Sequence, residues 1–269
     1  MFNILLPTDF SDNAQKAIDY AIYLFDKEEC TFYLLHAYYD VPSASDTKFN
    51  SENELKHLVE GIASKNENPK HHFERVFLTD SVVNALNITI IDKAVDYIFM
   101  GTKGASSLRN IFMGSNTVRV IKQLDTCPIV AVPADYDYDL PDEIAFANDF
   151  KHTFIAIELV PLINFTQLWN STLLVVHIRS EKKLSNDQKL NKELLKNALK
   201  EVKIRFLEVQ MEVSISSTLY RLEKENKKIG MVALLKIKRG FFEKLLREPV
   251  IRNISFNTKV PLLVLSKIE

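Results

Sequence analysis

YIFMGTKGASSLRNIFMGSN, residues 97–116, is the stretch from which the rest of the sequence can be interpreted. The chain has only six glycines in 269 residues, and three of them lie here, at Gly101, Gly104 and Gly114. An apolar run precedes the first glycine, and apolar residues at helical spacing follow the last, which predicts a strand, a loop and a helix start. A helix start offers unpaired backbone N–H groups and the positive end of the helix dipole, so the pattern favours a phosphate ligand.

The glycine spacing distinguishes this loop from the two commoner phosphate-binding loops. The order is glycine, two residues, glycine, nine residues and Gly-Ser, whereas neither G-x-x-x-x-G-K-[ST] nor G-x-G-x-x-G occurs in the chain. Any one of these glycines taken alone is a plain turn residue. Together they indicate a backbone that adopts a positive φ angle or that a ligand approaches closely.

Short apolar strands alternate with amphipathic helices through the first half of the chain. We expect strands over 3–6, 32–37, 73–78, 97–100 and 129–132, and helices after residue 11, from a capping box at 51–54, over 81–93 and over 115–124. This order predicts an α/β fold with a doubly wound, five-stranded, mostly parallel sheet in the order 3-2-1-4-5. Ligands bind such sheets where the winding reverses, which places residues 7–9 beside Gly101.

The second half repeats the first in weakened form. Residues 144–150 echo 4–10, 174–177 echo the strand ending at His36, and 260–265 echo 127–132. Three matches in order predict an internal duplication. We expect two tandem doubly wound domains, 1–138 and 139–269, with an acidic linker over 135–143, a helix over 187–203 and a strand over 231–235. The last strands, 129–132 and 262–265, are apolar and predict pairing of the two domains within one chain.

The motif and the flanking strands resemble the universal stress protein family. Gly101, Gly104, Gly114 and Ser115 match its G-2x-G-9x-G-[ST] motif, and residues 4–11, 33–37 and 127–133 also look like that family. The resemblance implies an adenine nucleotide alpha hydrolase-like fold that binds ATP, AMP or ADP, with Mg²⁺ held mainly by phosphate oxygens and water. It assigns nucleotide binding to Pro7, Thr8, Asp9, Ala37, Met100, Gly101, Gly104, Gly114, Ser115 and Asn116.

Backbone N–H groups at Gly104 and at 114–116 are expected to face the phosphates, with the Ser115 hydroxyl and Thr117 adding polar capacity. The second half lacks the glycines, and Glu248-Pro249 stands approximately where Gly114-Ser115 would be. A carboxylate repels phosphate and proline lacks an N–H, so we predict that the second domain does not bind a nucleotide in the same way. Phe241 and Phe242 are expected to close its cleft or face a partner.

Composition excludes several classes of function. The net charge of −1 gives no sign of a nucleic-acid partner, and no apolar run reaches the length of a membrane span. The chain begins without a signal-like segment, and Cys30 and Cys127 have neither metal-ligand nor disulfide-framework spacing. We therefore expect a cytoplasmic protein.

The resemblance to the universal stress protein family, with the glycine loop intact in one half and lost in the other, implies an ATP- or AMP-binding regulatory protein of the stress response. Two alternatives stay open: a slow ATPase or nucleotide-transfer enzyme at the same site, and a nucleotide-free interaction scaffold. Asp9 is the only candidate base near the loop, so we nominate no catalytic residue and no metal site in the protein. His36 and His177 recur at equivalent positions, which favours a structural role, and His71 and His72 are expected on the surface. The sequence leaves homodimerisation open.

Overall fold

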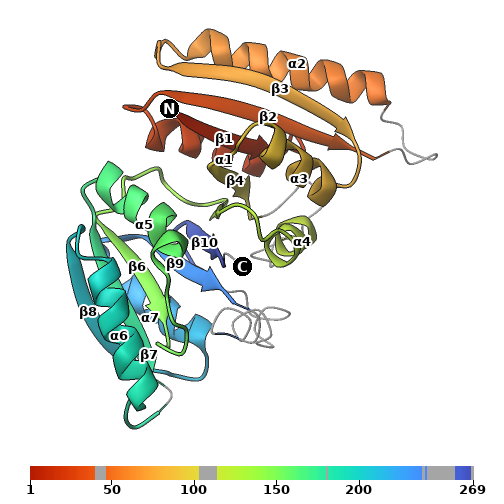
Figure 1. Ribbon diagram of the computed structural model, residues 1–269. Coiled ribbons are helices and arrows are strands. Elements are labelled where there is room, and N and C mark those ends of the chain that lie inside the picture. The colour runs from red at the N-terminus through yellow and green to blue at the C-terminus, as the bar shows by residue number, and fades with distance from the viewer. Residues whose placement is uncertain (40–46, 103–113, 180, 238–239, 241–257, 268–269) are drawn as a thin grey trace. The chain divides into compact units, whose positions relative to one another are not determined.

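The computed structural model describes residues 1–39, 47–102, 114–179, 181–237, 240 and 258–267. The chain divides into two compact units, with Ala134 the last residue of the first unit and Asp135 opening the main part of the second. Each unit is an α/β domain that contains five strands (Figure 1). Within the described residues, no helix is long and apolar enough to cross a membrane.

The sheet of the first unit has the predicted strand order. Its strands are β1 (Phe2–Pro7), β2 (Cys30–Tyr38), β3 (His71–Thr79), β4 (Tyr97–Gly101) and β5 (Ile129–Val132). They pair in parallel in the order β3-β2-β1-β4-β5. The winding therefore reverses between β1 and β4, as the sequence predicted. Residues 4–6 of β1 are completely buried, which is typical of a parallel strand covered on both faces.

The helices of the first unit are α1 (Asp12–Leu24), α2 (Lys48–Lys65), α3 (Val82–Asp92) and α4 (Ser115–Gln123). Figure 1 shows α2 lying along β2 and β3. The predicted capping box at 51–54 is wrong, because α2 begins earlier. Thr47 is its N-cap and accepts a hydrogen bond from the Asn50 amide, while Ser51 is fully buried inside the helix.

The second unit repeats the same topology. Its strands are β6 (Glu143–Asn148), β7 (Thr172–Arg179), β8 (Ile204–Gln210), β9 (Ile229–Lys236) and β10 (Leu262–Ser266). Their parallel order, β8-β7-β6-β9-β10, is again 3-2-1-4-5 when the strands are counted from β6. The helices are α5 (Ala156–Leu168), α6 (Asn186–Ala198) and α7 (Ile215–Glu225). This repetition confirms the tandem architecture.

Two expected boundaries in the second half are wrong. The helix predicted over 187–203 ends at Ala198, and residues from Ile204 onward form β8. Glu143, placed in the expected linker, is instead the buried first residue of β6, where Arg205 and Asn226 bind its carboxylate. Tyr136 is also buried, and its hydroxyl donates to the Gly230 carbonyl. The acidic segment thus packs on the second domain.

A buried carboxylate holds the chain where it enters β10. Glu223 of α7 accepts a hydrogen bond from the Lys259 amide, and only 7% of the residue is exposed. Burial raises the pKa of Glu223 from its ordinary value of 4.5 to about 7, although the hydrogen bonds from Lys259 and Thr258 oppose the shift. Because the unfolded chain ionises this group more readily than the folded one, the second domain loses stability as the pH rises from about 5 to 8.

We predict that Glu223→Gln removes this pH dependence, because the amide keeps an oxygen acceptor for Lys259 without carrying a charge. The variant should match the wild type at pH 5 and exceed its free energy of unfolding at pH 8 by an amount on the order of 2 kcal/mol. Denaturant unfolding followed by the fluorescence of Trp169, the single tryptophan, reports on this unit. An equal pH dependence in the two proteins would contradict the prediction.

Candidate functional site

A pocket of about 140 Å³ lies at the carboxyl ends of β1 and β4, where the winding of the first sheet reverses. Nine of the ten residues assigned to nucleotide binding line it: Pro7, Thr8, Asp9, Ala37, Met100, Gly101, Gly114, Ser115 and Asn116. The tenth, Gly104, lies outside the described residues, as do Lys103 and the rest of the loop up to Met113. Residues from three strand ends and one helix start thus meet at a single place.

The end of β1 forms one wall of the pocket. Thr8 is held on both sides, because its amide donates to the Leu35 carbonyl at 2.8 Å and its hydroxyl accepts from the Phe10 amide at 3.0 Å. Asp9 is exposed and accepts from both the amide and the hydroxyl of Ser11, which is the N-cap of α1. The Asp9 carboxylate therefore braces the start of α1 while it faces the pocket.

His36 also lines the pocket, at the end of β2. Its Nδ1 lies 2.9 Å from the Thr8 carbonyl oxygen, and its ring stacks on Phe10 with the ring centroids 4.5 Å apart. Phe10 has a φ angle of 61°, a left-handed conformation that few bulky residues adopt. The stacked pair fixes the turn that presents Asp9, which agrees with the structural role predicted for this histidine. Since Nδ1 is engaged, Nε2 is the ring atom left to face a ligand.

Gly101 ends β4 at the pocket. The position requires glycine, but not for the positive φ angle or close ligand approach that the sequence suggested. A Cβ atom there would lie against the Asn13 side-chain amide and 2.6 Å from the Asn13 carbonyl oxygen. The described glycines do not have positive φ angles, so the constraint at Gly101 is close packing of α1 on β4. On the other side, the buried Thr117 hydroxyl of α4 donates to the Gly101 carbonyl at 2.9 Å. Thr117 therefore anchors α4 and is not a spare ligand donor.

The start of α4 is the part of the pocket best suited to an anion. Gly114 is the N-cap and makes no side-chain hydrogen bond to the first turn. Its amide donates to the Thr102 carbonyl, so the expectation that the Gly114 N–H faces a phosphate is wrong. Ser115 and Asn116 follow as the first two helical residues, and both are exposed. The backbone amides and side chains of Ser115 and Asn116 are the donors that remain for an anion, and the helix dipole adds a favourable field.

Sequence reasoning missed several lining residues. Ala14, Leu35 and Val82 give the pocket apolar surface, and His36 adds a titratable group. Val82 is the first residue of α3, which follows β3 in the chain. Helix starts that follow parallel strands lie at the same edge of a sheet as the strand ends, so this position could have been included from the fold alone.

The titratable groups that line the pocket among the described residues are Asp9 and His36. Burial raises the pKa of the Cys30 thiol to about 12 and raises that of Cys127 as well, so neither thiol is a nucleophile at neutral pH. The described part of the chain contains no group of three His, Cys, Asp or Glu side chains arranged to hold a metal ion.

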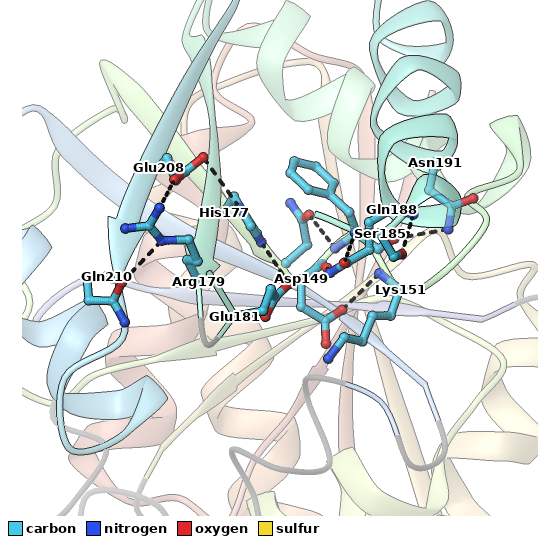
Figure 2. A network of polar contacts seen from close by, with 12 residues as sticks. Asp149, Lys151, His177, Arg179, Glu181, Ser185, Gln188, Asn191, Glu208 and Gln210 are labelled. Atoms are coloured by element: carbon cyan, nitrogen blue, oxygen red, sulfur yellow. Dashed lines mark hydrogen bonds and ion pairs between the residues drawn. The ribbon is translucent and has the colours of Figure 1, made fainter. Parts of the chain in front are cut away.

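At the corresponding edge of the second domain, side chains of α6 hydrogen-bond to the turn that follows β6 (Figure 2). The Gln188 amide of α6 donates to the Asp149 carbonyl at 2.8 Å, and the Asn191 amide donates to the Phe150 carbonyl at 3.0 Å. Asp149 and Phe150 are the counterparts of Asp9 and Phe10, and Phe150 repeats the left-handed conformation with a φ angle of 53°. The positions of Phe241, Phe242, Glu248 and Pro249 lie outside the described residues.

Comparison with known proteins agrees with this geometry. The family model described as "Universal stress protein family" matches residues 1–133. The universal stress protein MJ0577 of Methanocaldococcus jannaschii is 31% identical over 154 residues, which are 48% of this chain and 93% of that protein. The chain belongs to the universal stress protein family. The universal stress protein YxiE of Bacillus subtilis is 26% identical over 148 residues, or 49% of this chain and 99% of that protein.

The likeness in fold extends over both halves. The crystal structure of a universal stress protein from Archaeoglobus fulgidus superposes with a TM-score of 0.72 at 18% identity, covering 98% of each chain. At that identity the comparison establishes the shared fold alone. The tandem arrangement of two universal stress protein-like domains is therefore common to the two chains.

We predict that Gly101→Ala destabilises the first domain by about 1–3 kcal/mol, because the new methyl group meets backbone as well as side chain at Asn13. Gly61→Ala is the matched control, since no atom lies within 4 Å of the added group. Within α2 that change should stabilise the protein by about 0.5–1 kcal/mol. Denaturant unfolding followed by circular dichroism measures both. Equal effects of the two substitutions would contradict the close packing of α1 on β4.

Proposed function

We propose that the first domain binds an adenine nucleotide, ATP or one of its mono- and diphosphate forms, and that binding regulates the protein in a stress response. The observation that carries the proposal is the convergence of the predicted motif residues on one pocket at the reversal of the sheet. Membership of the universal stress protein family supports the class of ligand.

Each part of the pocket has a role in this proposal. The strand ends at Pro7–Asp9, Ala37 and Met100 provide a narrow slot with apolar walls and a carboxylate for the adenosine. Ser115 and Asn116 receive the phosphates at the start of α4, where the helix dipole favours negative charge. Because His36 is held by Thr8 through Nδ1, it presents its other ring nitrogen in a fixed direction. Gly104 is proposed to complete the phosphate site.

Mg²⁺, where it accompanies the nucleotide, would depend on phosphate oxygens and water. Asp9 is the carboxylate that lines the pocket among the described residues, and one carboxylate is too few for a protein-built Mg²⁺ cage. We divide the chain functionally at 138/139, with the nucleotide in the first domain. The absence of the glycine pattern from the second half supports this division. Two buried thiols suit a reducing compartment such as the cytoplasm.

Hydrolysis of the nucleotide is the runner-up. Asp9 is the candidate base, but two hydrogen bonds from Ser11 already engage its carboxylate and hold it at the start of α1. A binding role therefore fits the geometry better than catalysis. Saturable phosphate release by the wild type that Asp9→Ala abolishes would instead favour the enzyme. A site that stays empty in gently purified protein and in titration would favour the interaction scaffold.

We predict that Ser115→Asp weakens nucleotide binding without loss of stability. A carboxylate in the first turn of α4 repels phosphate, yet it interacts favourably with the helix dipole, so folding should be unchanged or slightly improved. Isothermal titration with ATP and Mg²⁺ should show saturable binding by the wild type. The variant should bind about 10- to 100-fold more weakly.

Asn186→Asp is the matched control, because Asn186 is the first residue of α6, as Ser115 is of α4. It adds the same charge at the same helical position in the second domain and should leave the affinity unchanged. For adenosine, which carries no phosphate, the affinities of the two variants should differ much less than they do for ATP. The proposal is rejected if the wild type shows no saturable binding, or if the two substitutions weaken binding equally.

A further inference from the structure

Both halves carry a histidine at the same position, but its neighbour on the adjacent strand is aromatic in one half and acidic in the other. His36 on β2 pairs in register with Phe77 on β3, whereas His177 on β7 pairs in register with Glu208 on β8. Both rings lie against a phenylalanine in the left-handed conformation, with centroids 4.5 Å apart for the stacked Phe10–His36 pair and 4.8 Å apart for the tilted Phe150–His177 pair. The framework is thus kept in the second half, while an aromatic neighbour is exchanged for a carboxylate.

His177 is buried among carboxylates without a hydrogen bond. Its side chain is only 4% exposed, and neither ring nitrogen has a hydrogen-bond partner. Nε2 lies 3.7 Å from a Glu181 oxygen, and Nδ1 lies 4.0 Å from a Glu208 oxygen (Figure 2). Both distances exceed the roughly 2.7–2.9 Å of a charge-assisted hydrogen bond. The neutral ring therefore sits about 1 Å too far from two acceptors placed on its two nitrogen edges.

The two carboxylates are held by other groups in this arrangement. The Gln188 side-chain amide, near the start of α6, donates to Glu181 and also to the Asp149 carbonyl. Arg179 binds Glu208 at 2.9 Å. A charge on His177 would compete for both carboxylates. Withdrawal of Glu181 would remove one of the two contacts through which Gln188 ties α6 to the rest of the domain.

The charged groups around His177 come from every element that packs on it. Glu181 follows β7, Glu208 lies on β8, Asp149 follows β6, and Lys192 lies on α6. Burial lowers the pKa of His177 below its ordinary value of 6.5, while Glu181, Glu208 and Asp149 raise it and Lys192 lowers it further. The Lys192 ammonium lies 5.8 Å from the centre of the Phe150 ring, so Lys192 and the Arg179 guanidinium place two cations beside the three carboxylates.

We propose that His177 is a proton-operated switch that loosens the start of α6 from the sheet of the second domain. On acidification the ring takes up a proton from solvent, and its two N–H groups then donate to Glu181 and Glu208. Gln188 loses its carboxylate partner, and the hydrogen bonds that join Gln188 and Asn191 to residues 149–150 are left to hold the helix. The switch is separate from the nucleotide pocket proposed for the first domain and does not depend on it.

The test is an NMR titration of the histidine side chains in the full-length protein, with His177 assigned by the signal missing from His177→Gln. We expect a midpoint below about 6.5 for His177. Over the same pH range, amide hydrogen-exchange protection of residues 188–191, whose bonded amides begin with Gln188 and Lys189 at Ser185, should fall at least tenfold after correction for the intrinsic rate. The first domain, where His36 lies beside Phe77 and not beside a glutamate, is the internal reference. Hydrogen-exchange protection of α1 in that domain should not follow the His177 midpoint.

Charge-neutral variants separate the switch from general acid sensitivity. Glu181→Gln combined with Glu208→Gln should lower the His177 midpoint by about one pH unit or more, because it removes groups that stabilise the imidazolium. Glu193→Gln removes one negative charge from an exposed position on α6 and should leave the midpoint unchanged. If the double variant does not fold, the wild-type curves decide alone. A His177 midpoint without a matching loss of protection, an unshifted midpoint in the folded double variant, or no titration down to pH 4 in the folded protein would each overturn the proposal.

Discussion

The structure of the site depends on the close contact of two helices with the end of one strand at Gly101. Asn13 of α1 occupies the space that a side chain would need, and Thr117 of α4 donates to the Gly101 carbonyl. These contacts place the start of α1, the end of β4 and the start of α4 around one pocket. A glycine that looks like a ligand contact in the sequence is thus first a packing residue, and the pocket is a consequence of the packing.

The two domains show how one scaffold supports different chemistry at the same edge. Both keep a left-handed phenylalanine against a strand-end histidine. In the first domain the histidine bonds to the Thr8 carbonyl and the edge remains open as a pocket. In the second, amides from α6 take the carbonyls of the corresponding turn, and carboxylates surround the histidine. The second half therefore keeps the aromatic framework but surrounds its histidine with a different polar network.

Much of this could be predicted because parallel strands and their helices carry strong local signals, and because strand order limits which strand ends can meet. The features that were missed depend on partners far away in the sequence. His71 was expected on the surface, yet it is buried with its Nε2 3.1 Å from the Phe25 carbonyl. Glu143 was read as linker because its partner Arg205 is 62 residues away. At α2 the sequence pattern predicted a start at the capping box of 51–54, whereas the N-cap is Thr47 and the helix packs on β3.

In the function that we propose, main-chain amides at the start of α4 receive the phosphates of a nucleotide. The most direct measurement is the backbone amide NMR spectrum of the full chain during titration with AMP and with ATP plus Mg²⁺. The account predicts saturable shifts for Ser115 and Asn116, larger with ATP, while the amides of Asn186 and Asp187 at the start of α6 stay in place. Saturable binding that leaves Ser115 and Asn116 unshifted, or the absence of any saturable shift, would contradict it.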